Sequence, residues 1–324
     1  MPSSSAPLVN FSAPDSATTQ ILTREISAFL SHLVKNGGPT PAEYPLLNYH
    51  LTNFGNPHFL NNLSAEQIGD LRNSLGIALS PETIQGWAYH KPLGYAGDYL
   101  LIEKIYKNYV CPNPDLRKWD LFSHTQKATK AIRNRISFFL EQMWKTHTEA
   151  PMKSRVLNLA SGPGRDLNEA LRVLGSPNIY VDCVEQDERA IEYSRHLCSE
   201  FLPQIQFINK NALKFTSQNA YHLIWSGGLF DYFNDSIFKR MIKRLYPLLE
   251  PDGRLIIGNF SSENPSKGYM DLFSWNLFHR THDQLRALAE ESGVANHQIS
   301  IEQEPEGINL FLVIQNSPAK QSAQ

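Results

Sequence analysis

The sequence has few cysteines, almost no net charge and no long apolar segment, and each shortage excludes a class of protein. Its three cysteines, Cys111, Cys183 and Cys198, match no metal-binding spacing. The formal charge of the 324 residues is -2, and no block of Lys and Arg supplies the basic stripe that nucleic-acid binding requires. No apolar run reaches the length of a membrane span. We therefore expect no metal site, no nucleic-acid partner and no membrane span.

The cysteines and the first residues also bear on location. Cys183 lies within an apolar run, where a reduced thiol acts as a small apolar side chain. Residues 1–19 lack the basic start and the apolar stretch of a secretory signal, and we interpret them and residues 318–324 as flexible tails. A reducing cytoplasm is the compartment that these features favour.

The part of the chain before residue 150 is predicted to be mainly helical. Apolar residues in 20–35 recur at helical spacing, and Ser64 begins a capping-box pattern ahead of a second helix. A longer helix is expected at 125–144, and no strand signal of comparable strength appears in this part. We expect residues 20–149 to form a helical N-terminal domain.

From Ser154 onward, short β-rich runs alternate with segments of helix length, which is typical of a parallel sheet flanked by helices. The turn at 305–307 is too short for a crossover helix, so the last two strands must form an antiparallel hairpin. We place the domain boundary near Ala150-Pro151 and predict an α/β, Rossmann-like sheet over 150–317. Its seven expected strands are 155–160, 179–185, 205–209, 223–226, 254–259, 298–303 and 309–314.

A glycine turn follows the first of these strands, in VLNLASGPGRD at 156–166. Gly162 and Gly164 would admit a ligand against bare backbone, and Glu185 at the end of the next strand would accept hydrogen bonds from ribose hydroxyls. A dinucleotide fingerprint needs a third glycine where Leu167 stands, because a pyrophosphate must reach the start of the helix. S-adenosylmethionine has no phosphate, and the spacing favours it as the cofactor.

Several motifs in order along the chain resemble class I S-adenosylmethionine-dependent methyltransferases. VLNLASGPGRD is similar to the first motif of this family and CVEQDERAI to the second, while HLIWSGGLFDYF and LLEPDGRLIIGNF are similar to the segments of the fourth and fifth strands. The resemblance covers residues 150–317 and implies a seven-stranded methyltransferase sheet that ends in an antiparallel hairpin. The cofactor-binding residues that it implies, with Tyr99 added from the N-terminal part, are Asn158, Ala160, Gly162, Gly164, Asp166, Glu185, Gln186, Asn211, Ala212, Ser226, Gly227 and Tyr99.

Two positions depart from the family pattern. Asn158 stands where the family has an acidic residue, and Ala160 replaces the first glycine of the turn. Asp187 is an alternative to Glu185 for the ribose, although Glu185 is preferred because it ends the apolar run. A glycine turn that serves only the packing of strand against helix is the structural alternative.

The segment HKPLGYAGDYLLIEKIY, His90 to Tyr106, is the second distinctive element. Its glycines permit tight turns, and its tyrosine hydroxyls and Asp98 suit contact with a ligand better than a plain linker does. We expect it to close over the cofactor, with a buried turn as the alternative. The GYAGDY signature resembles a bacterial methyltransferase subgroup that includes the enzymes proposed to make the methyl ester of 3-hydroxypalmitic acid.

The methyl acceptor should lie beyond the carboxyl ends of the strands, as ligands do in open α/β sheets. The candidate acceptor-binding residues are Tyr232, Asn259, Tyr269, Trp275 and Arg280, and the candidate catalytic residues are Tyr95, Asp98, Asp231 and His279. His222 is interpreted as structural. Arg133 and Arg135 are interpreted as solvated helix charges, unless one faces the pocket and binds a carboxylate.

We therefore predict an S-adenosylmethionine-dependent methyltransferase of a small molecule, with the helical N-terminal part as lid and acceptor wall. O-methylation of a hydroxy fatty acid-like carboxylic acid is favoured, because an ionised carboxylate needs placement but no base. N-methylation or phenol O-methylation of a small metabolite is an alternative. A non-catalytic cofactor-binding or interaction protein is another, and methylation of a protein or RNA is a third. The expected partner is the small-molecule acceptor, and a homodimer is left open.

Overall fold

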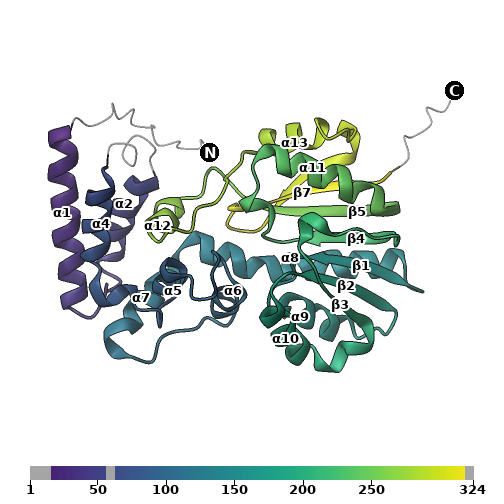
Figure 1. Cartoon of the computed structure of the whole chain (residues 1–324), viewed down its shortest axis with the longest axis horizontal. Coiled ribbons are helices and arrows are strands. Elements are labelled where there is room, and N and C mark those ends of the chain that lie inside the picture. The colour runs from purple at the N-terminus through teal and green to yellow at the C-terminus, as the bar shows by residue number, and fades with distance from the viewer. Residues whose placement is uncertain (1–15, 56–62, 318–324) are drawn as a thin grey trace, which may run out of the picture. The chain divides into compact units, whose positions relative to one another are not determined.

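The computed structural model describes residues 16–55 and 63–317, and the chain divides into two compact units (Figure 1). The first unit consists of the residues up to His90 together with Val110–Phe122 and Pro265–Ser274. The second consists of Lys91–Tyr109, Ser123–Asn264 and the residues from Trp275 onward. This division differs from the boundary expected near Ala150-Pro151, because much of the segment before it packs with the sheet.

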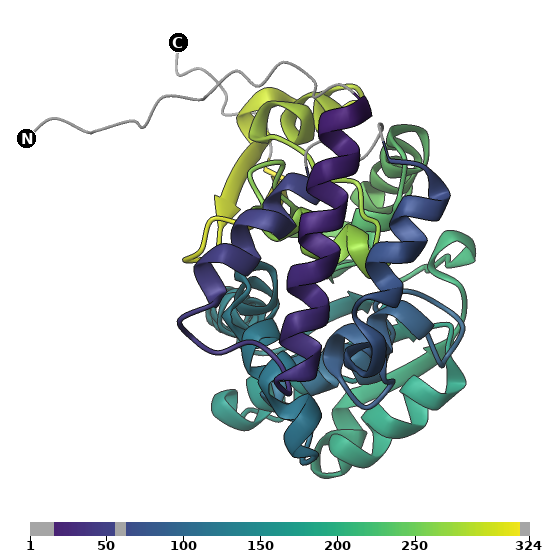
Figure 2. The same ribbon diagram turned by 90° about the vertical axis from the view of Figure 1, so that its left-hand side faces the viewer.

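The first unit is helical, as predicted. Figure 2 shows its longest helix, α1, as the purple ribbon at the front. The helices of this unit are α1 (Ser16–Lys35), α2 (Tyr44–Gly55), α4 (Ala65–Asn73), α5 (Ile84–His90), most of α7 (Pro114–Thr125) and α12 (Lys267–Leu272). Ser64 caps α4 in a complete capping box with Gln67, which confirms that prediction. Residues 16–19 begin α1 instead of ending a flexible tail, and residues 1–15 and 318–324 lie outside the described ranges.

The second unit contains one sheet of seven strands in the order β3-β2-β1-β4-β5-β7-β6. Its strands are β1 (Ser154–Leu159), β2 (Ile179–Glu185), β3 (Ile205–Asn209), β4 (Tyr221–Ser226), β5 (Leu249–Phe260), β6 (Ile299–Gln303) and β7 (Asn309–Gln315). The first five run parallel, whereas β7 lies antiparallel between β5 and β6. The predicted α/β fold class with its terminal hairpin is therefore confirmed.

Helices cover both faces of this sheet (Figure 1). Successive strand residues face opposite sides, so Val156 packs with α8 (Lys127–Glu149) and α9 (Arg165–Leu174). Leu157 packs on the other side with α11 (Asp235–Leu245) and α13 (His282–Glu290). The helices α6 (Tyr99–Tyr106) and α10 (Glu188–Leu197) complete the unit. Phe138 and Phe139 of α8 belong to the core of the sheet, which explains why residues before 150 join this unit.

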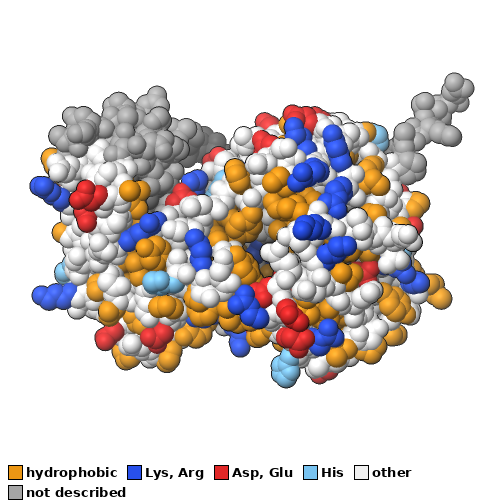
Figure 3. Space-filling view, viewed as in Figure 1, with side chains coloured by type: hydrophobic (Ala, Val, Ile, Leu, Met, Phe, Trp, Pro, Cys, Tyr) orange, Lys and Arg blue, Asp and Glu red, His pale blue; other side chains and the backbone are white. Residues whose placement is uncertain are grey.

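The helix α11 illustrates how an amphipathic pattern positions these helices. Phe238, Met241 and Ile242 are buried on its inner side, whereas Arg240 and Lys243 are exposed. Figure 3 shows basic side chains gathered over this helix. Within the described ranges, no helix combines the length and the apolar character needed to cross a membrane.

Candidate active site

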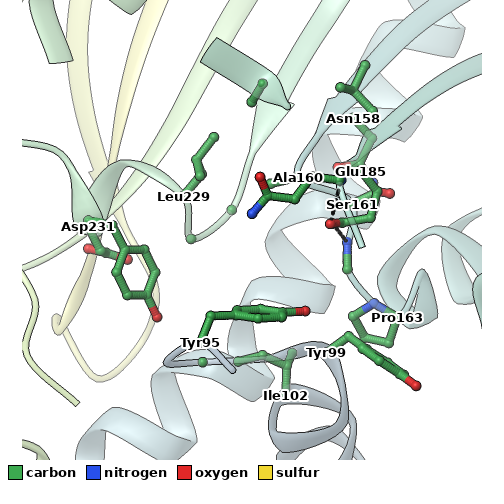
Figure 4. Close-up of a pocket in the computed structure, with 18 of the residues that line it drawn as sticks. Tyr95, Tyr99, Ile102, Asn158, Ala160, Ser161, Pro163, Glu185, Leu229 and Asp231 are labelled. Atoms are coloured by element: carbon green, nitrogen blue, oxygen red, sulfur yellow. Dashed lines mark hydrogen bonds between the residues drawn. The ribbon is translucent and has the colours of Figure 1, made fainter. Parts of the chain in front are cut away.

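A cavity of about 390 Å³ lies at the carboxyl ends of the parallel strands (Figure 4). Its volume is within the range of small-molecule sites, roughly 300–1,000 Å³. The residues that line it all belong to the second unit. They come from the carboxyl-terminal ends of β1, β2, β4 and β5 and the segments after β1, β3 and β4, from the loop before α6, from the helices α6, α8 and α9, and from the segment after α12.

Glu185 joins the two turns on one side of this cavity. Its Oε2 accepts a hydrogen bond from the backbone N–H of Gly162 at 3.0 Å. Its Oε1 accepts from the N–H groups of Gln186 and Asp187 at 2.7 and 2.9 Å. Burial raises the pKa of the Glu185 carboxyl above its usual value. A carboxylate has about four acceptor positions, so a further donor can still bind.

Asn211 and Gln186 lie next to this carboxylate. The Nδ2 of Asn211 donates to Oε1 of Gln186 at 2.7 Å, and its Oδ1 accepts from the N–H of Leu213. Both residues line the cavity, as does Ala212. The structure thus brings these predicted cofactor residues together with Glu185.

The turn after β1 has a left-handed backbone at Ala160, Gly162 and Gly164, with φ values of +57°, +54° and +70°. A Cβ added to Gly162 would meet no described atom within 4 Å, so this backbone faces open space. Gly164 has a different role: its Cβ would lie 2.0 Å from Oγ of Ser194. Gly162 therefore presents backbone to the cavity, whereas Gly164 lets α9 and α10 approach each other.

Arg135 lines the cavity, which corresponds to the alternative left open for it and not to the first interpretation as a solvated helix charge. Only 6% of it is exposed, so it is not a solvated helix charge. Its Nη1 donates to the carbonyl of Gly227 at 2.7 Å, and its Nε has no hydrogen-bond partner among the described residues. It lies three residues after Ile132 on α8, and both line the cavity, so their helical spacing was the available signal. Arg133 does not line the cavity and contacts His124.

Two buried carboxyl groups, Asp166 and Asp231, line the cavity and interact electrostatically with Arg135. Burial raises the pKa of Asp166 to about 6 and that of Asp231 to about 7, while Arg135 opposes both shifts. Asp231 accepts a hydrogen bond of 2.7 Å from the backbone N–H of Phe260. Figure 4 shows Asp231 and Glu185 on opposite sides of the cavity.

The side of the cavity near Asp231 is mainly apolar and aromatic. Nε1 of Trp275 donates to the hydroxyl of Tyr232 at 2.9 Å, and that hydroxyl donates to the carbonyl of Ala96 at 3.0 Å. Further residues on the cavity wall are Ile102, Tyr106, Ile132, Trp225, Leu229, Phe233, Phe260 and Leu277. None of these eight was named as a site residue from the sequence, because an apolar or aromatic side chain carries no chemical signature of a site.

Tyr95 and Tyr99 come from the GYAGDY segment and both line the cavity. The hydroxyl of Tyr95 donates to Oδ2 of Asp187 at 3.0 Å. Burial and this carboxylate raise the pKa of Tyr95 far above its usual value. Its phenol is therefore protonated at neutral pH and does not suit the role of base.

Other predicted residues do not line the cavity. Asp98 is buried at the start of α6, where it caps the helix by accepting from the N–H of Leu101 at 2.9 Å. Ser226 donates to the carbonyl of Leu159 at 3.3 Å. Tyr269 belongs to the first unit, where its hydroxyl donates to Oε1 of Gln85 at 3.2 Å. Each of these side chains contacts the protein itself.

Asn259, His279 and Arg280 also lie outside the cavity wall. Arg280 is 3% exposed, pairs with Asp235 at 2.8 Å, and donates to Oδ1 of Asn259 at 2.7 Å. His279 lies 3.1 Å from Nδ2 of Asn264. These contacts connect the segment after β5 to the rest of the second unit. His222 accepts from the N–H of Arg155 at 3.1 Å, in keeping with its expected structural role.

The sheet order, the antiparallel insertion of β7 and the position of the cavity together define the fold of the class I methyltransferases. Residues 156–253 match a family model described as a methyltransferase domain. This match supports the predicted enzyme class and S-adenosylmethionine as its cofactor.

Several solved structures are similar to this chain. A possible exported protein from Bordetella parapertussis is 16% identical, with 95% of this chain and 100% of that chain covered and a TM-score of 0.56. The 1,6-didemethyltoxoflavin-N1-methyltransferase of Burkholderia thailandensis is 15% identical, with 61% of this chain and 86% of that chain covered and a TM-score of 0.43. Magnesium protoporphyrin IX methyltransferase from Synechocystis is 15% identical, with 59% of this chain and 87% of that chain covered and a TM-score of 0.46. No curated protein sequence matches the chain.

Proposed function

We propose that this protein is an S-adenosylmethionine-dependent methyltransferase that acts on a small molecule. The observation that carries the proposal is one cavity with two different sides. One side has the glycine turn and the Glu185 carboxylate, and the other has aromatic side chains around Asp231. The methyltransferase match of residues 156–253 supports the same conclusion.

The residues present fit the cofactor. Glu185, Gln186 and Asn211 offer acceptors and donors for an adenosine. Nδ2 of Asn158 and Nε of Arg135 are buried and lack partners in the part of the chain that the structure describes. We propose that these two atoms bind the amino-acid end, since a carboxylate supplies the acceptors that they need. When bound, the cofactor supplies an activated methyl group on its sulfonium.

The protein contributes alignment and a dry environment to the transfer. The residues around Trp275 and Phe260 would exclude water and hold the acceptor in line with the methyl group. Residues Lys91–Tyr109 belong to the same unit as the cavity, and we propose this segment as the lid. The carbonyl of Gly227 holds the Arg135 guanidinium at the cavity wall.

For the acceptor, we keep a hydroxy fatty acid-like carboxylic acid as the first candidate. An acyl chain fits the apolar wall near Leu229 and Leu277, and the GYAGDY resemblance points to the same class. An ionised carboxylate attacks the methyl group without first losing a proton, so this reaction requires no base.

Asp231 favours a second candidate, namely N-methylation or phenol O-methylation. A carboxyl group with a pKa near 7 could accept the proton that an ammonium group must lose before its nitrogen attacks, or that a hydroxyl group loses, so that the nitrogen or oxygen bonds to the methyl carbon. The bond from methyl to sulfur breaks at the same time, and the proton later leaves Asp231 for solvent.

A panel of acids, amines and phenols with radiolabelled cofactor tests both candidates. For a carboxylic acid, Asp231→Asn should retain most of the turnover. For an amine or phenol, the same variant should lose about 100-fold or more, the usual contribution of a general base. A chain that binds S-adenosylhomocysteine but methylates no member of the panel would favour the non-catalytic alternative.

We also propose a cytoplasmic location. Cys111, Cys183 and Cys198 are all buried free thiols, a state that a reducing compartment preserves. Fractionation of cells that produce the full chain, with detection in the cytoplasmic fraction as the expected result, tests this proposal.

A further inference from the structure

The loop Leu93–Gly97, which we call the clasp, is attached to both sides of the cavity. It precedes α6 and carries both glycines and the first tyrosine of the GYAGDY segment. Figure 4 shows Tyr95 of the clasp near the space between Glu185 and Asp231. Its two attachments involve different residues.

The first attachment is beside Glu185. The hydroxyl of Tyr95 donates to Oδ2 of Asp187 at 3.0 Å, and Nη2 of Arg189 donates to the carbonyl of Leu93 at 3.0 Å. Arg189 also pairs with Asp187 at 2.9 Å. Because the N–H of Asp187 donates to Glu185, this end of the clasp is connected to the carboxylate proposed to bind the ribose.

The second attachment is beside Asp231. The hydroxyl of Tyr232 donates to the carbonyl of Ala96 and accepts from Nε1 of Trp275. A Cβ on Gly97 would lie 2.2 Å from this hydroxyl, and φ at Gly97 is +66°. Only glycine therefore allows the clasp to approach Tyr232 so closely.

The clasp backbone between these points is short and irregular. Gly94 has φ of +94°, and a Cβ there would meet no described atom within 4 Å. Ala96 is adjacent to Tyr95 in the chain, so a displacement of its carbonyl must shift the neighbouring tyrosine. Loss of the hydrogen bond from Tyr232 to Ala96 should therefore weaken the hydrogen bond from Tyr95 to Asp187.

We propose that Tyr232 is a positioning residue for the cofactor, although it lies on the acceptor side of the cavity. By holding the carbonyl of Ala96, it keeps Tyr95 on Asp187 and the clasp closed over the adenosine. This inference rests on the proposed function. Its consequence is that cofactor affinity depends on a hydroxyl group beside the acceptor.

The test measures binding and dissociation of S-adenosylhomocysteine by the full chain, using calorimetry and stopped-flow fluorescence. Tyr232→Phe and Tyr95→Phe each remove one hydroxyl and should each weaken binding roughly three- to tenfold, mainly through faster dissociation. The double variant should be little weaker than the worse single variant, because both contacts hold one loop. In a reaction, KM for the cofactor should rise more than kcat falls.

Tyr221→Phe is the matched control. Its hydroxyl donates to Asp182 at 2.7 Å and does not line the cavity, so this variant should bind like the wild type. If Tyr232→Phe does not fold, Trp275→Phe, which removes a donor to the same hydroxyl, should show a smaller effect in the same direction. The inference would be overturned if folded Tyr232→Phe or Trp275→Phe bound S-adenosylhomocysteine with wild-type affinity. It would also be overturned if the losses of affinity in Tyr232→Phe and Tyr95→Phe multiplied fully in the double variant. Absence of binding by the wild type would instead overturn the proposed function.

Discussion

Glu185 accepts a hydrogen bond of 3.0 Å from the backbone N–H of Gly162, so the carboxylate at the end of β2 fixes the glycine turn that follows β1. The same side chain accepts two further backbone N–H groups from its own turn. One residue thus organises two chain segments and keeps an acceptor position for a ligand. The arrangement makes Glu185 both structural and functional.

Replacement of Glu185 by Ala should therefore abolish measurable binding of S-adenosylhomocysteine. It removes a ligand group and leaves up to three N–H groups without their acceptor, at a cost of about 1–3 kcal/mol for each group that stays buried. Calorimetry measures the affinity and urea denaturation measures the stability. Glu192→Ala, an exposed change on α10, is the control and should alter neither. Wild-type affinity in folded Glu185→Ala would refute the site.

The sheet could be predicted from the sequence because each strand is a short apolar run between polar turns. Strand β2 has the predicted bounds, Ile179–Glu185. Strand β1 begins and ends one residue earlier than predicted, and β7 ends one residue later. Periodicity predicts such elements well, since the burial of a strand is set by its local pattern. The boundaries of the two units depend instead on packing between residues that are distant in sequence. For this reason Phe138 and Tyr269 belong to units that the sequence did not indicate.

Polar residues were harder to place, because the same residue type serves a ligand site or a helix cap. Asp98 and Asp231 are both buried acids in promising motifs, yet the first caps α6 and the second lines the cavity. For Arg135 a solvated charge and a pocket residue were both possible, since a guanidinium on a helix resembles a solvated charge until its buried face is known. Distinguishing these cases requires the positions of neighbours that are distant in sequence.

Arg135→Met should weaken binding of S-adenosylhomocysteine while leaving that of 5′-methylthioadenosine nearly unchanged. The second ligand lacks the amino-acid end, so it does not need the buried guanidinium. We expect a loss of about 10- to 100-fold for the first ligand, as for a charged hydrogen-bonded pair. Arg133→Met, on the same helix but outside the cavity wall, is the matched control. Equal losses for both ligands would contradict the proposed orientation of the cofactor.

Asp231 should make the stability of the protein depend on pH. Its pKa is raised from 3.8 to about 7 in the folded state, so the folded protein binds a proton more tightly than the unfolded chain does. The free energy of unfolding that protonated Asp231 contributes is fully present below pH of about 4. It is lost as pH rises towards and through 7, at up to about 1.4 kcal/mol per pH unit. Urea denaturation from pH 4 to 8 should show a shallower decline for Asp231→Asn.

Asp166 provides a second carboxyl group with which the pH dependence of stability can be compared. Its pKa is raised only to about 6, so Asp166→Asn should remove a smaller part of the decline, ending at lower pH. If the free energy of unfolding falls equally with pH in the wild type and in Asp231→Asn, the Asp231 carboxyl is not held in its protonated form in the folded state.

Gly164→Ala should destabilise the protein through a collision between α9 and α10. The added Cβ would lie 2.0 Å from Oγ of Ser194, at a residue whose φ is +70°. We expect a loss of about 2–4 kcal/mol in the free energy of unfolding. Gly175→Ala is the matched control: its φ is +60° but no described atom lies within 4 Å, so only about 1–2 kcal/mol is expected. Equal losses would show that the neighbouring helix adjusts without cost.

Gly97→Ala tests the close approach of the clasp to Tyr232 by steric means. The added Cβ would lie 2.2 Å from the hydroxyl of Tyr232, so this variant should open the clasp and weaken S-adenosylhomocysteine binding by about tenfold or more. Adding Tyr232→Phe removes the hydroxyl that collides, so the double variant should bind better than Gly97→Ala alone. Gly94→Ala shares the left-handed backbone but meets no described atom within 4 Å, and it measures the effect of strain by itself. If Gly97→Ala and Gly94→Ala weaken binding equally, backbone strain explains the result and the contact with Tyr232 does not.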